Sequence, residues 1–329
     1  MELTFEQWRQ MQKDLRRRFS SVGWILLGYY LIMNVAVFFC VFVEIIIKMM
    51  MQLSSGNMGA ILDVAMESVT SAWGYFLAAA VGLLILLIWK KPRYWREQIW
   101  AKGKPMKAND FLGILCIFMS GQAVYQAGVM LLELVLNCFG LSIMEGMNAL
   151  AVDTGSFSMF LYAGILAPIT EEILFRGLIQ KTLMPYGKKL AIFCSAFTFG
   201  IFHGNLIQTP YAFLVGLVLG YVASEYSIAW AMVLHMINNL VIADLLPRLT
   251  QELPEMTASL IMWAVIILFA VAAVMIALVK RRKIRAYLRS ERMNRTCLRC
   301  FFSSPGVIVL MAVMGLSLIF TFILMLAPL

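Results

Sequence analysis

Long apolar stretches recur along the whole chain and constrain its fold more than any other feature. Of the 329 residues, 62% are hydrophobic and only 14% are charged, whereas a typical soluble domain is about half apolar and about a quarter charged. A helix that crosses the hydrocarbon core of a bilayer needs about 20 mostly apolar residues. We count nine candidate stretches: 22–46, 69–89, 111–138, 157–180, 190–206, 210–226, 229–246, 258–279 and 305–327.

These stretches predict helices, not strands. Backbone groups in lipid must find partners within their own segment or in a closed barrel. None of the stretches shows the alternation of apolar and polar residues that a barrel strand has. We therefore expect an all-α fold, a polytopic transmembrane helix bundle of about nine spans in the cell membrane. The fifth to seventh stretches are short, so their boundaries are the least defined.

The basic residues predict the orientation of the bundle. Of the 27 Lys and Arg residues, 24 fall in segments on one predicted side: 1–21, 90–107, 181–189 and 280–300. The opposite side holds two, Lys48 and Arg248. Cytoplasmic loops collect basic residues, so we expect the N-terminus inside and the C-terminus outside.

The net charge of +9 is therefore first a signal of topology, and attraction to anionic membrane lipids follows from it. Binding to nucleic acid would need a basic soluble domain, which the sequence lacks. Residues 2–18 and 90–107 mix basic with aromatic side chains, and such segments usually lie at the membrane interface. We expect both to be interfacial anchors.

Ionisable side chains inside the predicted spans are few, and each is costly in lipid. Glu44 and Asp244 lie near span ends, where they can reach water, and Glu133 lies deeper and could pair with another helix. The remaining five are expected to group together: Glu171, Glu172, Arg176, His203 and His235.

The stretch APITEEILFRG, residues 167–177, holds three of these side chains. Glu172 and Arg176 are four positions apart, so on a helix they can form an ion pair that lowers the cost of burying both. Glu171 points about 100° away from Glu172 on a helix and is expected to face a cavity. Pro168 removes a backbone donor one turn earlier, which suits a kinked helix beside a polar site.

Both histidines of the chain are intramembrane in this interpretation. His203 lies in FTFGIFHGN, and His235 lies in VLHMINN with Asn239 one helical turn further on. A single buried histidine is usually a core residue with satisfied hydrogen bonds. Two histidines at the depth of paired glutamates favour a catalytic site instead.

Three sequence motifs resemble those of a known family. APITEEILFRG, Phe199-Gly-Ile-Phe-His203 and His235-Met-Ile-Asn-Asn239 resemble the motifs EExxxR, FxxxH and HxxxN of the CPBP family. These are CAAX-processing and bacteriocin-processing intramembrane proteases, also called the Abi family, and they are related to the eukaryotic prenyl-CAAX endopeptidase. The resemblance implies a protease core over 110–245. Residues 1–109 would then add a basic interfacial segment and two accessory spans, and 246–329 two further spans with the basic loop 280–300.

The resemblance also implies roles for the motif residues. Glu171 and His203 would activate water, while His235 and Asn239 would stabilise the oxyanion. Glu172 and Arg176 would support the site or contact substrate, with Phe199 as a further supporting residue. Peptide hydrolysis requires a base that activates water and donors placed where negative charge develops, which agrees with these residue types.

A metal-dependent version of this mechanism stays open. Glu171, His203 and His235 form a His₂Glu set like that of some catalytic zinc sites. The sequence lacks an HExxH motif, and the Asn239 amide would be a poor zinc ligand, so we favour no cofactor while keeping zinc as the alternative.

Two other classes of protein would also keep ionisable residues inside a membrane. A proton-coupled transporter usually shows inverted repeats, which are not visible here. A non-catalytic bacteriocin-immunity scaffold would be free to lose Glu171 or His203, and both are present. We therefore favour a protease that cuts membrane-anchored or lipidated, CAAX-like substrates or leader peptides.

Overall fold

The structure, a computed structural model, describes residues 4–55, 72–149 and 157–326. Over these residues the chain is helical and contains no strand, as predicted. The longer helices are α1 (Phe5–Ser55), α3 (Trp73–Trp89), α5 (Ala108–Met119), α6 (Gly121–Asn137), α11 (Lys188–Phe202), α12 (Gln208–Glu225), α13 (Ile228–Ile237), α15 (Glu255–Val279), α16 (Arg281–Ser290) and α18 (Pro305–Leu326). Residues 2–3, 69–71 and 327, which the predicted segments include, lie outside the described part.

Short segments join or interrupt these helices. Four of them are π-helical: η2 (Trp95–Ile99), η3 (Tyr162–Leu166), η4 (Ile173–Gln180) and η6 (Asn238–Leu245). The others are α4 (Pro92–Tyr94), α7 (Met144–Ala149), α8 (Phe157–Leu161), α9 (Ala167–Glu172), α10 (Lys181–Leu183), η5 (Met184–Tyr186), α14 (Leu246–Thr250) and α17 (Arg295–Phe302).

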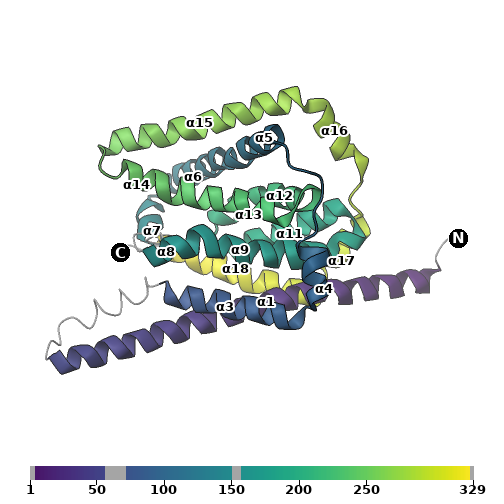
Figure 1. The fold of residues 1–329 in the computed structure, drawn as a ribbon, viewed down its shortest axis with the longest axis horizontal. Coiled ribbons are helices and arrows are strands. Elements are labelled where there is room, and N and C mark those ends of the chain that lie inside the picture. The colour runs from purple at the N-terminus through teal and green to yellow at the C-terminus, as the bar shows by residue number, and fades with distance from the viewer. Residues whose placement is uncertain (1–3, 56–71, 150–156, 327–329) are drawn as a thin grey trace.

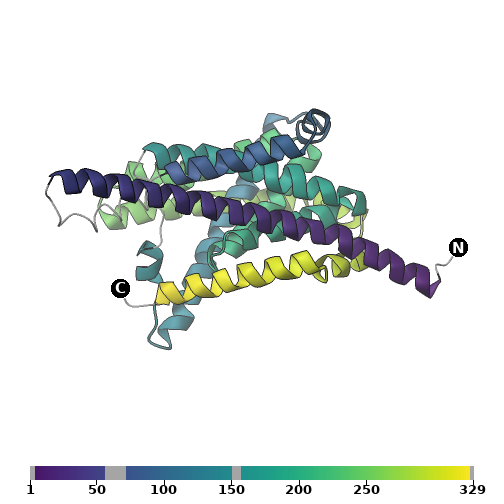
Figure 2. The same ribbon diagram turned by 90° about the horizontal axis from the view of Figure 1, so that it is seen from below.

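The helices pack in layers (Figure 1). Helix α15 packs on α5 and α6, and these two contact α12. Helices α9, α11, α12 and α13 form the middle of the bundle, while α1, α3 and α18 cover its other side. Figure 2 shows that α1 runs along the whole length of that side and extends beyond the bundle at both ends. The site lies in the middle layer.

Six helical segments in the described part are long and apolar enough to cross a membrane, or seven if a bent pair counts as one span. They are Phe5–Met51, Ala108–Asn137, Phe157–Tyr186, Ile228–Thr250, Glu255–Val279 and Pro305–Leu326, and the bent pair is Trp73–Trp89 with Pro92–Ile99, at 105°. Each overlaps a predicted span. The predicted number of about nine is not reached by this measure, and the predicted orientation stays a prediction.

The difference from nine comes chiefly from α11 and α12. These helices have 15 and 18 residues and pack against each other as a hairpin. At 1.5 Å per residue, α11 is about 22 Å long, shorter than the hydrocarbon core of about 30 Å. Most of α11 is buried, from Leu190 to Ile201. A helix enclosed by other helices does not have to match the thickness of the bilayer.

The N-terminal helix also differs from the simplest expectation. The predicted interfacial segment and the first predicted span are parts of one continuous helix, α1, of 51 residues. Such a helix is about 77 Å long, so it exceeds what a bilayer core requires. A close approach to α18 fixes its position, because a Cβ on Gly23 would lie 2.1 Å from the backbone of Gly306. Only glycines permit this contact.

Candidate active site

The EExxxR motif lies where α9 passes into the π-helical segment η4. Glu172 Oε1 and Arg176 Nη1 lie 3.0 Å apart, and both side chains have no exposed surface. The predicted ion pair is therefore confirmed. Arg176 Nη2 also donates to the carbonyl of Gly216 in α12 at 3.2 Å. A buried ion pair is tolerated only with such additional hydrogen bonds, because its charges have lost their water.

Glu172 makes a second contact that the sequence did not predict. The same oxygen, Oε1, lies 3.0 Å from Nδ1 of His235 in α13. An ionised carboxylate can only accept hydrogen bonds, so Nδ1 must carry the proton. The bond therefore fixes the orientation of the imidazole and directs Nε2 away from Glu172.

Glu171 lies beside this ring on the accessible side. Its Oε2 is 3.7 Å from His235 Nε2, and its side chain is 31% exposed, while that of Glu172 is fully buried. The two adjacent glutamates thus contact opposite nitrogens of one imidazole. Glu172 is enclosed by protein, and Glu171 is the carboxylate that a substrate or water can reach.

Phe199 brings the two histidines together. Its ring meets the rings of His203 and His235 edge to face, with centroids 4.9 Å and 5.8 Å apart. The guanidinium carbon of Arg176 lies 4.3 Å from the centroid of the same ring, within the range of a cation–π interaction. Phe199 is buried. The phenylalanine of FxxxH therefore acts as a spacer that holds three polar groups at fixed positions.

His203 lies at the C-terminal end of α11. Its Nδ1 is 2.8 Å from the carbonyl oxygen of Phe199. Because a carbonyl only accepts, Nδ1 is the protonated nitrogen in the neutral ring, and Nε2 keeps a lone pair. Among the described residues, Glu171 and His203 share no hydrogen bond or ion pair, so the predicted water-activating pair does not touch directly.

The next residue, Gly204, ends the helix. Its φ of 61° is left-handed, a conformation that favours glycine. Its carbonyl accepts a hydrogen bond from Thr321 Oγ1 of α18 at 2.9 Å. The C-terminal helix, predicted as an accessory span, thus supports the turn that follows His203.

Asn239 is held by a chain of side chains that the sequence did not single out. Asn239 Nδ2 donates to the carbonyl of Ala163 at 2.9 Å, and Asn238 Nδ2 donates to Asn239 Oδ1 at 3.1 Å. Tyr211 donates its hydroxyl to Asn238 Oδ1 at 2.7 Å, and Gln122 Nε2 donates to the Tyr211 oxygen at 2.8 Å.

The direction of donation along this series of hydrogen bonds is fixed at its Asn239 end. The Ala163 carbonyl can only accept, so the Asn239 amide must present its nitrogen there and its oxygen to Asn238. Because the Asn239 oxygen can only accept, Asn238 presents its nitrogen to Asn239 and its oxygen to the Tyr211 hydroxyl. An amide nitrogen carries two hydrogens, so Asn239 retains one donor for another acceptor. In the sequence, Tyr211 and Gln122 carried no signal beyond being polar residues in apolar stretches.

Three π-helical segments surround these residues. Asn238 and Asn239 open η6, Ala163 lies in η3, and η4 follows Glu172 directly. A π-helix shifts backbone carbonyls out of the α-helical pattern, and such segments occur often at functional sites. The Asn239 bond to Ala163 and a bond from the Tyr94 hydroxyl to the Gly177 carbonyl at 2.8 Å satisfy two of these carbonyls. Tyr94 belongs to the predicted interfacial segment 90–107.

The zinc alternative needs Glu171, His203 and His235 around one ion. Within the described ranges, no three His, Cys, Asp or Glu side chains come close enough together to hold a metal. The required ligand set is therefore not assembled in this arrangement of the described residues.

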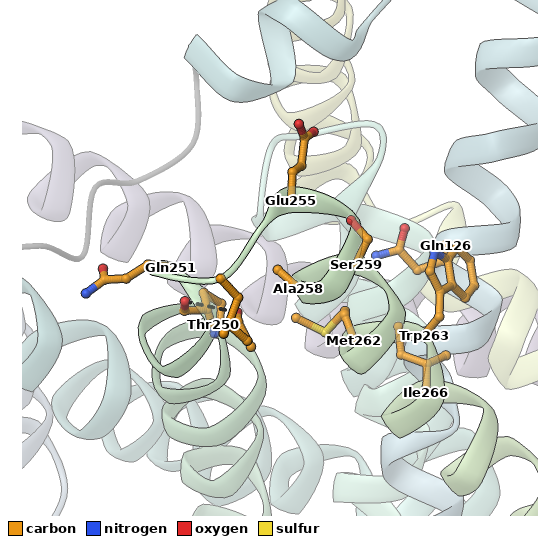
Figure 3. Close-up of a pocket in the computed structure, with 11 residues that line it drawn as sticks. Gln126, Thr250, Gln251, Glu255, Ala258, Ser259, Met262, Trp263 and Ile266 are labelled. Carbon is orange, nitrogen blue, oxygen red and sulfur yellow. Dashed lines mark hydrogen bonds between the residues drawn. The ribbon is translucent and has the colours of Figure 1, made fainter.

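A pocket of about 550 Å³ lies elsewhere, between α14, α15 and α6 (Figure 3). Gln126, Thr250, Ser259 and Trp263 are among its lining residues, and none of the predicted site residues reaches it. We therefore do not assign the chemistry of the site to this pocket.

These observations describe a multi-pass membrane protein with a carboxylate–histidine site buried among its helices. Residues 153–241 match the family model described as type II CAAX prenyl endopeptidase Rce1-like. The matched segment contains all three motifs, and this match agrees with the family that the resemblance predicted. No curated protein and no solved structure matches the chain. The family supports an intramembrane endopeptidase in general. The boundaries of the predicted 110–245 core stay a prediction.

Proposed function

We propose that the protein hydrolyses a peptide bond inside the membrane with a water activated by Glu171 and His203. His235 and Asn239 would stabilise the oxyanion. The observation that carries this proposal is the clamp on His235: Glu172 holds Nδ1 at 3.0 Å while Nε2 faces Glu171 at 3.7 Å. Catalysis requires such preorganised groups, because donors that are already in place need no reorganisation as charge develops.

In the first step, the Glu171 carboxylate removes a proton from water. The water oxygen bonds to the carbonyl carbon of the peptide, and the carbonyl oxygen becomes an oxyanion. Glu171 is suited to this role because its side chain is partly exposed. His203 Nε2 can accept a hydrogen bond from the same water, since Nδ1 is committed to the Phe199 carbonyl.

The oxyanion would then meet two donors. His235 can donate through Nε2 when the ring is protonated, while Nδ1 donates to Glu172 Oε1. Asn239 can donate its second amide hydrogen while the first stays on Ala163. In the last step the carbon–nitrogen bond breaks, and the leaving amine takes the proton that came from water, through Glu171 or His203.

For the substrate we propose a membrane-anchored or lipidated peptide. The matching family is described as a prenyl endopeptidase, so a prenylated CAAX peptide is the first candidate, and leader peptides are the second. A site enclosed by transmembrane helices favours substrates that are already held in the bilayer. Such anchoring removes part of the entropic cost of association.

The test uses the full-length protein reconstituted in vesicles with two CAAX peptides that differ only in a prenyl group, and with a leader peptide and a membrane-anchored peptide. Cleavage is followed by mass spectrometry of the products. We expect wild type to cut the prenylated peptide and Glu171→Gln to be inactive. Absence of cleavage of prenylated, leader and membrane-anchored peptides alike would contradict the proposed function.

A further inference from the structure

A second cavity, apart from the site, lies along the first turns of α1. Its volume is about 1060 Å³, and we call it the basic groove because Arg9, Lys13, Arg16 and Arg17 line it. Its other wall is the turn between α17 and α18, with Ser303 and Pro305. The lining residues belong to the first turns of α1 and to the turn between α17 and α18; in Figure 1 this part of α1 leaves the bundle toward the N-terminus beside α17.

The groove has an excess of unpaired positive charge. Four cationic side chains line it against one carboxylate, Glu6. In the described part of the chain, none of the four cations forms an ion pair. The α18 helix begins at Pro305, so the positive end of its dipole also faces this region. The basic groove therefore favours an anionic group.

Hydroxyl groups also line the groove. Ser20 Oγ accepts a hydrogen bond from the backbone nitrogen of Gly306 at 2.8 Å. Ser303 Oγ is buried and finds no hydrogen-bond partner among the described residues. A buried hydroxyl without a partner carries a free-energy cost that a bound acceptor would remove. Phosphate oxygens are such acceptors.

The same face of α1 continues as an apolar stripe. Trp24 ends the basic groove, and Leu31, Val35, Phe38 and Phe42 follow at helical spacing; each is more than half exposed. A tryptophan between a charged and an apolar surface is typical of a membrane interface. This face thus presents cations, then an interfacial aromatic ring, then hydrocarbon, in the order of the parts of a phospholipid.

We propose that this face of α1 binds an anionic phospholipid, with its phosphate headgroup in the basic groove and its acyl chains along the apolar stripe. Charge complementarity selects the headgroup, and the stripe distinguishes a lipid from free phosphate. The proposal does not depend on the activity of the protein or on which side the N-terminus lies.

The test compares two variants of the full-length protein that lose the same charge. The groove variant carries Arg9→Gln, Lys13→Gln, Arg16→Gln and Arg17→Gln. The control carries Arg281→Gln, Arg282→Gln, Lys283→Gln and Arg285→Gln in α16. All eight side chains are exposed, so both variants are expected to fold. The pair Arg9→Gln and Lys13→Gln serves as a milder groove variant.

Each purified protein is titrated in detergent with phosphatidylglycerol and with phosphatidylcholine, and bound lipid is measured by native mass spectrometry. We expect about tenfold or more weaker phosphatidylglycerol binding in the groove variant, about twofold or less change in the control, and little phosphatidylcholine binding by any protein. Equal losses in both variants, or no loss in either, would overturn the proposal. In a further titration, inorganic phosphate competes with phosphatidylglycerol for the wild-type protein. If phosphate displaced the bound lipid as effectively as added phosphatidylglycerol does, the groove would be a phosphate site, and this result would also overturn the proposal.

Discussion

The Glu172 carboxylate holds Nδ1 of His235 at 3.0 Å, although the two residues are 63 positions apart in the chain. This bond joins α9 to α13 and decides which imidazole nitrogen faces Glu171. The bond also gives Glu172 a second role, because the i, i+4 spacing in the sequence predicted only its ion pair with Arg176. The EE pair is therefore divided between two functions: one glutamate holds the site together, and the other faces it.

The division of labour between the glutamates gives the first prediction. Glu171→Gln is expected to abolish cleavage with nearly unchanged thermal stability, because it removes the base from a partly exposed position. Glu172→Gln is expected to lower the free energy of unfolding by about 3–5 kcal/mol, since it leaves Arg176 buried without its counter-charge. Cleavage assays and thermal melts in detergent measure both effects. Similar behaviour of the two variants in both assays would refute the division.

The sequence predicted the parts of the site better than their connections. The motif residues and the Glu172–Arg176 pair could be predicted because helical spacing determines local neighbours. The Glu172–His235 bond could not, because it depends on how α9 packs against α13. The Asn239–Ala163 bond could not, because it joins two π-helical segments, whose side chains are rotated relative to an ideal α-helix. The predicted number of about nine spans is not confirmed, for a related reason. Hydropathy does not distinguish a lipid-facing span from a short helix such as α11 that is enclosed by protein.

The hydrogen-bond chain to Asn239 gives a second prediction. Tyr211→Phe removes the hydroxyl that donates to Asn238 Oδ1 at 2.7 Å and leaves the longer bond from Gln122 Nε2 at 3.2 Å. The Asn239 amide should then be less well positioned for the oxyanion. We expect kcat to fall about tenfold with KM nearly unchanged, because the donor acts only as charge develops. Such a loss corresponds to about 1.4 kcal/mol of transition-state stabilisation.

A neighbouring tyrosine provides the matched control for this variant. The ring of Tyr125 packs on Tyr211 with centroids 5.4 Å apart, but it lies outside the chain from Gln122 to Asn239. Tyr125→Phe should therefore leave kcat within about twofold of wild type, a change of less than ~0.5 kcal/mol. Equal losses in kcat for the two variants, or a Tyr211→Phe effect on KM alone, would contradict a positioning role for the Tyr211 hydroxyl.

The turn after His203 gives a third prediction. Gly204→Ala places a side chain at a φ of 61°, where a Cβ would also lie 2.6 Å from Ser317 Oγ. The left-handed conformation alone costs roughly 1–2 kcal/mol, and relief of the contact would displace His203. We expect lower thermal stability together with a loss of kcat. Gly315→Ala in α18 is the control, because a Cβ there meets nothing within 4 Å; a comparable loss in both variants would contradict this account.

The last prediction separates the metal-free mechanism from the zinc alternative. In the metal-free mechanism Asn239 donates to the oxyanion, so Asn239→Ala should reduce kcat by about 10²–10³-fold, the usual effect of losing one such donor. KM should change little, and a chelator should leave wild-type activity unchanged. With Glu171, His203 and His235 as zinc ligands, the expected results are the opposite. The chelator would abolish activity and added zinc would restore it. Asn239→Ala would then reduce kcat less than substitution of either histidine. The measurements are steady-state cleavage before and after chelation and the metal content of the purified protein. One bound zinc per chain with zinc-rescued activity would overturn the metal-free mechanism and leave the endopeptidase function intact.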